Sequence, residues 1–201
     1  MITAASAVDS QGAAFALEAR FVGSSALGDT FHGYLIFDSP ATVLNLFDIN
    51  WVSDSDFYQT GAPFGGDTPP NSGFFGFDPD LQWDTYVSIG VMDSTVGDDT
   101  TTDPDFAFGS NSVVGGYFDA NPGSPDGATD ENNEVFIGQF TVASGARGDS
   151  GPMSGSAGVT YKDAGGVTIQ EYPVCWATCI PTPGAGIGLL AGLGLVSRRR
   201  R

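Results

Sequence analysis

The chain is poor in basic residues and in the residues that favour helices. Lys and Arg make up only seven of its 201 residues, against 24 Asp and Glu, so the formal net charge is −17. A surface of this kind repels nucleic acid and anionic lipid headgroups, and nucleic acid is therefore not expected as a partner of the acidic domain. Methionine occurs three times, whereas there are 29 glycines and 15 phenylalanines. This composition indicates short strands joined by polar loops.

Most of the basic residues lie together at the end of the sequence. Pro181-Thr182-Pro183 precedes an uncharged segment rich in Gly, Ala and Leu, residues 184–196, and an arginine run, 198–201, follows it. An apolar segment that ends in arginines is held in a membrane with its cationic end on the cytoplasmic side. As a helix this segment spans about 20 Å, short of a hydrocarbon core of roughly 30 Å. We therefore expect a transient signal; a plain membrane anchor and a basic nucleic-acid tail are the alternatives.

These three parts resemble the PEP-CTERM sorting signal of bacteria, in which a proline motif, a hydrophobic helix and a basic end are recognised and cleaved by an exosortase. Thr182 stands where the family motif has glutamate, and the resemblance is confined mainly to residues 181–201. It implies an exported protein, transiently anchored in the inner membrane, with an exosortase-like enzyme as partner and extracellular polysaccharide nearby. The residues assigned to sorting are Pro181, Pro183, Gly184, Arg198, Arg199, Arg200 and Arg201.

Secretion is also suggested by Ala5-Ser6-Ala7, a small-residue pattern of the signal-peptide cleavage type. The predicted organisation is a signal-peptide remnant in residues 1–7, one β domain in 8–180 and the sorting or membrane segment in 181–201. Cys175 and Cys179 are close enough in sequence to form a local disulfide in an oxidising compartment, with free or intermolecular thiols as the alternative.

Alternating apolar and polar residues indicate strands in the middle of the chain. In residues 15–21, for example, Phe15, Leu17 and Phe21 fall on one face. Similar windows are 31–38, 43–51, 85–91, 113–118, 134–143, 154–162 and 166–172. The predicted fold class is all-β, a single two-layer β-sandwich of jelly-roll type with long acidic loops, plus a short C-terminal hydrophobic helix.

The candidate ligand sites are the long loops, residues 57–73, 93–112 and 119–133, because long loops in a compact domain are usually functional or disordered. Ca²⁺ takes six to eight oxygen ligands, which such loops supply. The spacing does not fit the calcium-loop pattern, so the indication rests on composition, and solvated loops are the alternative. The candidate ligands are Asp98, Asp99, Asp103, Asp105, Asp119, Asp126, Asp130 and Glu131.

No catalytic group is indicated. Gly148-Asp149-Ser150-Gly151-Pro152 is similar to the sequence around the nucleophile of trypsin-like proteases, but one glycine is missing. A serine nucleophile needs a histidine base, and the only histidine, His32, is expected on a strand, opposite in phase to Phe31 and Leu35. Among 24 acidic residues, a glycosidase-like pair arises by chance.

The expected function is therefore a structural or adhesive role at the cell surface or in the extracellular matrix. The first alternative is a carbohydrate-binding or Ca²⁺-dependent adhesion module, and the second is a secreted glycan hydrolase. Exposed aromatic residues can stack on sugars, although core packing is the commoner role. The aromatic candidates are Trp51, Trp83, Phe74, Phe75 and Phe77.

Overall fold

The computed structural model describes residues 15–145 and 152–176, which form strands and three short 3-10 helices. The strands are β1 (Phe15–Ser25), β2 (Gly28–Phe37), β3 (Ala41–Ser53), β4 (Tyr86–Val87), β5 (Thr100–Thr102), β6 (Ala107–Phe108), β7 (Ser112–Asp119), β8 (Glu134–Val142), β9 (Met153–Asp163) and β10 (Thr168–Cys175). The 3-10 helices are η1 (Ser72–Phe74), η2 (Pro79–Trp83) and η3 (Ser94–Val96). The predicted all-β class is confirmed.

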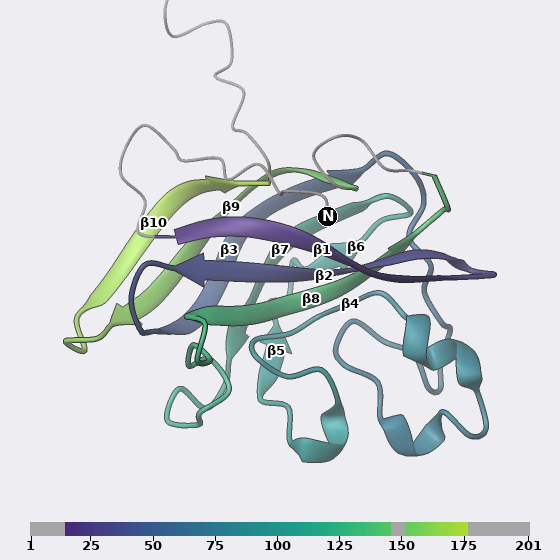
Figure 1. Cartoon of the computed structure of the whole chain (residues 1–201), viewed down its shortest axis with the longest axis horizontal. Helices are drawn as coiled ribbons and strands as arrows, with labels where there is room; N and C mark the ends of the chain where they lie inside the picture. The colour runs from purple at the N-terminus through teal and green to yellow at the C-terminus, as the bar shows by residue number, and fades with distance from the viewer. Residues whose placement is uncertain (1–14, 146–151, 177–201) are drawn as a thin grey trace, which may run out of the picture.

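All strand pairs are antiparallel, and they form two sheets (Figure 1). The first sheet has the order β1-β2-β8-β4. The second sheet has the order β10-β9-β3-β7-β5, and β6 also pairs with β7. The short 3-10 helices lie together at one end of the molecule, beyond β4 and β5 in the view of Figure 1.

The long strands follow the alternation of the sequence. In β2, Phe31, Leu35 and Phe37 are buried, whereas His32 and Tyr34 between them are half-buried. Successive side chains of a strand point to opposite faces, so one face of β2 packs into the interior and the other faces outward. The predicted phase of His32 is confirmed.

Two parts of the sequence-based assignment are wrong. The strand predicted over 85–91 is reduced to β4, because only Tyr86 and Val87 pair with β8. Residues 85–89 are buried without a break, so side chains of both phases are enclosed and the alternation there does not mark an exposed face. Conversely, the segment 93–112, expected as a loop, contains β5 and β6, which lie along β7.

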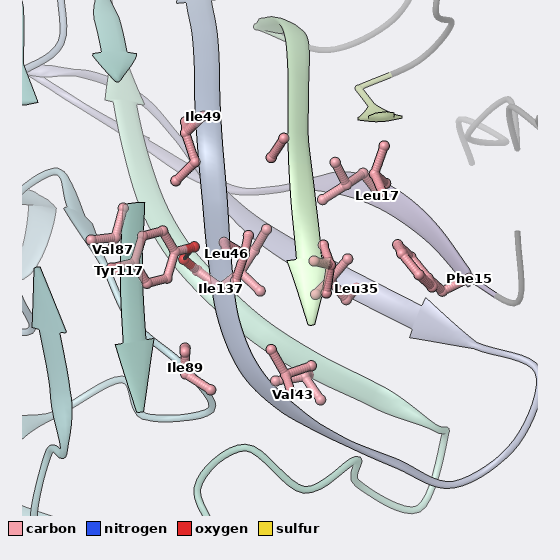
Figure 2. Packing of buried hydrophobic residues seen from close by; sticks show 14 of the residues in the cluster. Phe15, Leu17, Leu35, Val43, Leu46, Ile49, Val87, Ile89, Tyr117 and Ile137 are labelled. Atoms are coloured by element: carbon pink, nitrogen blue, oxygen red, sulfur yellow. Dashed lines mark hydrogen bonds between the residues drawn. The ribbon is translucent and has the colours of Figure 1, made fainter. Parts of the chain in front are cut away.

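Side chains from both sheets belong to one hydrophobic cluster. Figure 2 shows Leu35 and Ile137 of the first sheet and Leu46 of the second among the side chains of this cluster. Trp51 of β3 is fully buried, with its ring centroid 5.9 Å from that of Phe140 in an edge-to-face contact. This shared interior stabilises both sheets, because burial of apolar area is the main favourable term in folding.

Within the described ranges, no helix is long and apolar enough to cross a membrane. The sorting residues 181–201 lie outside these ranges, as do Ala5-Ser6-Ala7 and Ser150. Cys175 is a described residue and is disulfide-bonded. Cys179, the other cysteine of the chain, lies outside the described residues.

Candidate functional site

Four of the eight predicted acidic ligands come together where the segment before β5 meets the segment after β7. The amide of Ala120 donates to the carbonyl oxygen of Asp99 at 2.8 Å, which joins the two segments. Asn121 Nδ2 also donates to Asp99 Oδ2 at 3.3 Å. Besides burial, the negative charges of Asp126 and Asp99 help to raise the pKa of both Asp98 and Asp119. We call Asp98, Asp99, Asp119 and Asp126 the acidic cluster.

Asp119 is the buried member of the acidic cluster, with 6% of its surface exposed. Its Oδ1 accepts a hydrogen bond from the amide of Asn121 at 2.8 Å, whereas its Oδ2 is buried without a hydrogen-bond partner. Burial raises the pKa of Asp119, the Asn121 amide opposes this, and the charges of Asp126 and Asp99 raise it further. Burial raises the pKa of Asp98 as well. Among residues 15–145 and 152–176, no basic side chain forms an ion pair with the acidic cluster.

The geometry of the acidic cluster does not by itself form a metal site. Among the described residues, no three or more His, Cys, Asp or Glu side chains are arranged to hold a metal ion. Ca²⁺ also accepts amide and backbone carbonyl oxygens, so Asn121 and the main chain would have to complete its ligands. Ca²⁺ binding at these residues stays a prediction.

The other four predicted ligands lie elsewhere. The amide of Asp103 donates to the carbonyl oxygen of Gly116 at 2.9 Å. Asp103 and Asp105 therefore lie further along β7, away from Asp119. Asp130 instead closes the turn before β8, where its Oδ1 accepts from the amides of Asn132 at 2.8 Å and Glu134 at 2.9 Å. These hydrogen bonds lower the pKa of Asp130, and the bond from the Glu134 amide has the largest effect. Glu131 is exposed in the same turn.

A cleft of about 360 Å³ opens beside this turn, on the outward side of the first sheet. The cleft is lined by Tyr34, Gly90, Met92, Ala128, Asp130, Asn132, Glu134, Val135 and Phe136. Arg20 of β1 stands at its side, with its guanidinium carbon 4.7 Å from the centre of the Tyr34 ring. Arg20 donates to both carboxylate oxygens of Glu134, at 2.5 and 2.6 Å.

The carboxylates of the cleft are already engaged. The ion pair with Glu134 raises the pKa of Arg20, because the pair stabilises the charged guanidinium. Both oxygens of Glu134 accept from Arg20, and Asp130 Oδ1 is bound to backbone amides. Both carboxylates of the cleft are therefore held by groups of the protein itself. Sequence reasoning missed the cleft, although Glu18 and Arg20 on one face of a strand were a signal of an outward ion pair.

His32 is held by an amide. Its Nε2 lies 3.0 Å from Gln139 Oε1, and Gln139 Nε2 donates to the carbonyl oxygens of Gln82 and Asp84. Burial lowers the pKa of His32, and the hydrogen bond with Gln139 opposes this in part. A histidine base of the serine-protease type is oriented by a carboxylate. The amide partner of His32 therefore does not support the protease interpretation.

The predicted aromatic candidates have different fates. Trp51 is fully buried in the core, and Trp83 lies against Gly23 of β1. Phe74 and Phe77 are exposed, at 40% and 84%. Phe74 packs against Phe64, with ring centroids 5.0 Å apart. The predicted set therefore does not form one platform.

Comparison with known proteins identifies no relative. No family model, curated protein or solved structure matches the chain. The function is therefore inferred from the chemistry of the chain itself.

Proposed function

We propose that the chain is an exported bacterial protein with a structural or adhesive role at the cell surface or in the extracellular matrix. The observation that carries this proposal is the order of parts in residues 181–201, a proline motif, an apolar segment and four arginines. Such a segment has one favoured orientation in a membrane, with the arginines on the cytoplasmic side and the β domain outside. An exosortase-like enzyme is the proposed processing partner, and the membrane association is transient.

The described residues are compatible with this role. The acidic surface keeps the domain soluble and repels other copies of itself. His32 is bound to an amide and Glu134 is paired with Arg20, so neither of these two residues supports the hydrolase alternative.

The proposal includes a two-layer sandwich for the domain. Trp51 of the second sheet meets Phe140 of the first, and Phe15 of β1 lies 5.5 Å from Tyr161 of β9 between ring centroids. After β2 the chain crosses to β3 of the second sheet, adds β4 to the first sheet and β5, β6 and β7 to the second, and returns to pair β8 with β2. The orders β1-β2-β8 and β3-β9-β10 correspond to A-B-E and C-F-G of immunoglobulin-like sandwiches. We therefore favour that arrangement over the jelly-roll order.

The export proposal is tested by mass spectrometry of the protein from the cytosol, envelope and medium of the source bacterium. We expect the wild-type protein in the envelope or medium, without Arg198–Arg201. Replacement of these four arginines by glutamine removes the cationic end and is expected to reduce processing, whereas the control Arg147→Gln leaves it unchanged. Recovery of the intact chain from the cytosol would contradict the proposal.

A Ca²⁺-dependent adhesion module is the second candidate function, favoured by Asp119 Oδ2 of the acidic cluster, which is buried without a hydrogen-bond partner. Ca²⁺ at ten times its dissociation constant would add about 1.4 kcal/mol to stability. For a domain of this size we therefore expect Tm to rise by roughly 3–6 °C in Ca²⁺ relative to EGTA. Asp119→Asn is expected to abolish the rise, and the exposed Asp105→Asn to retain it. An equal Tm of the wild-type protein in Ca²⁺ and EGTA would remove this candidate.

A further inference from the structure

The outward face of the second sheet carries the residues that alternate with its core residues. Ala157, Val159 and Tyr161 of β9 belong to the hydrophobic core. The residues between them, Gly158 and Thr160, therefore point to the opposite, outward face. Because directly paired residues share a face, the partners of Gly158 and Thr160 extend this face over the neighbouring strands.

An aromatic ring lies flat on this face. Phe47 of β3 is paired with Gly158 of β9. A Cβ atom at position 158 would overlap three carbon atoms of the Phe47 ring. The glycine therefore leaves the space in which the Phe47 ring rests on the backbone of β9, so that the ring presents a face outward.

Tyr172 of β10 extends the aromatic surface. The ring centroids of Phe47 and Tyr172 are 6.3 Å apart, and the ring planes differ by only 25°. The Tyr172 residue is 59% exposed. The two nearly parallel rings thus form a strip across β3, β9 and β10, which we call the aromatic strip.

The residues paired beside the aromatic strip are polar and uncharged, and Lys162 of β9 follows beyond Thr160 on the same face. Asn45 pairs with Thr160, which also pairs with Gln170, and Asn50 pairs with Ser156 on the other side of the strip. These side chains carry hydroxyl and amide groups, which both donate and accept hydrogen bonds. The Asn45 amide oxygen is buried, so Asn50 and Gln170 supply the exposed amides of this face. The chain as a whole has a net charge of −17, whereas this part of its surface consists mainly of amides, hydroxyls and two aromatic rings. The nearest acid along β3, Asp48, lies in the bulge between Phe47 and Asn50.

We infer that the aromatic strip and its polar neighbours bind a neutral polysaccharide. The apolar faces of successive sugar rings would stack on Phe47 and Tyr172, and sugar hydroxyls would bond to the surrounding amides and hydroxyls. The charge of the protein argues against an anionic polysaccharide, because the acidic domain repels it. The cleft of the first sheet is less suited, since Arg20 covers a face of Tyr34 and Phe136 is only 4% exposed. This inference rests on the proposed extracellular function, which brings the protein to such polymers.

Binding of the purified protein to insoluble cellulose and chitin, both neutral, tests the inference, with soluble alginate as the anionic comparator. We expect retention on at least one neutral polymer and none on alginate. Tyr172→Ala removes one stacking ring and is expected to weaken retention about tenfold. Gly158→Ala keeps both rings but displaces the ring of Phe47. This variant is therefore also expected to weaken retention. The matched control is Phe77→Ala, which removes an exposed ring elsewhere and should bind as the wild type does.

Three outcomes would overturn the inference: no retention on cellulose and chitin, equal retention of Tyr172→Ala and the wild type, or preference for alginate. Light scattering adds a fourth, since a dimer that Tyr172→Ala dissociates would assign the face to a second copy of the chain. Urea unfolding checks that Tyr172→Ala is folded, and Tyr172→Phe, which keeps the ring, should bind when folding is intact. A protein that is exported but binds no neutral polymer removes only this inference, whereas a cytosolic protein that binds removes only the proposed function.

Discussion

Replacement of Trp51 by alanine is expected to destabilise the domain by about 3–5 kcal/mol, a large part of the stability of a typical domain. Trp51 is fully buried, and its ring lies 5.9 Å from that of Phe140 and 5.3 Å from that of Trp176. Truncation leaves a cavity where strands of both sheets meet. The measurement is urea unfolding followed by circular dichroism at neutral pH.

Two further variants make the Trp51 result specific. Phe77 is 84% exposed, so Phe77→Ala is expected to change the unfolding free energy by less than about 0.5 kcal/mol. The indole nitrogen of Trp51 is buried without a hydrogen-bond partner. Trp51→Phe removes this unpaired donor together with part of the ring, so its cost should lie well below that of Trp51→Ala. A loss below about 1 kcal/mol for Trp51→Ala would contradict a shared core between the sheets.

The strands of this fold could be predicted from the sequence wherever one face is buried and the other is not. In β2, buried Phe31 and Leu35 alternate with the outward His32 and Tyr34, and the alternation is visible in the sequence. In residues 85–89 the same alternation wrongly predicts an exposed face, because the polar Thr85 and Ser88 are as fully buried as Val87. Their hydrogen bonds to segments distant in sequence satisfy them, and no local pattern records such bonds.

The sites could be predicted less well, because they depend on register. The acidic cluster contains four of the eight candidate ligands, Asp98, Asp99, Asp119 and Asp126. This selection follows from the contact of residues 97–100 with residues 119–121. The aromatic strip depends on the bulge after Phe47, which fixes what lies opposite Gly158. A shift of one residue would turn these side chains to the opposite face. Register is set by the whole sheet, so the sequence of one strand cannot reveal it.

The pH dependence of stability is expected to contain a large contribution from Asp84. This residue is fully buried; its Oδ1 accepts from the amides of Thr60 at 2.7 Å and Thr85 at 3.0 Å, and its Oδ2 has no hydrogen-bond partner. Burial raises the pKa of Asp84 from 3.8 to about 6, the amides of Thr60 and Thr85 oppose the shift, and the charge of Asp67 adds to it. The ionised carboxylate is therefore the less favourable form in the folded protein.

The direction of the effect follows from linkage. Because the folded pKa of Asp84 lies above the unfolded one, its contribution to stability is fully present below pH 3.8 and is lost as the pH rises through about 6. The shift corresponds to roughly 3 kcal/mol. Asp84→Asn does not titrate, so the free energy of unfolding of this variant relative to the wild type should rise by about this amount between acidic and neutral pH.

Urea unfolding of the wild type and Asp84→Asn at several pH values between about 3.5 and 7.5 measures this difference. The comparison at each pH cancels the contributions of Asp98 and Asp119, whose pKa values are also raised by burial. The exposed Asp80→Asn on η2 is the matched control, and its profile should run parallel to that of the wild type. A constant difference between Asp84→Asn and the wild type across this range would show that the Asp84 carboxylate is solvated, and that the segment bound to it through Thr60 is not closed over the sheet.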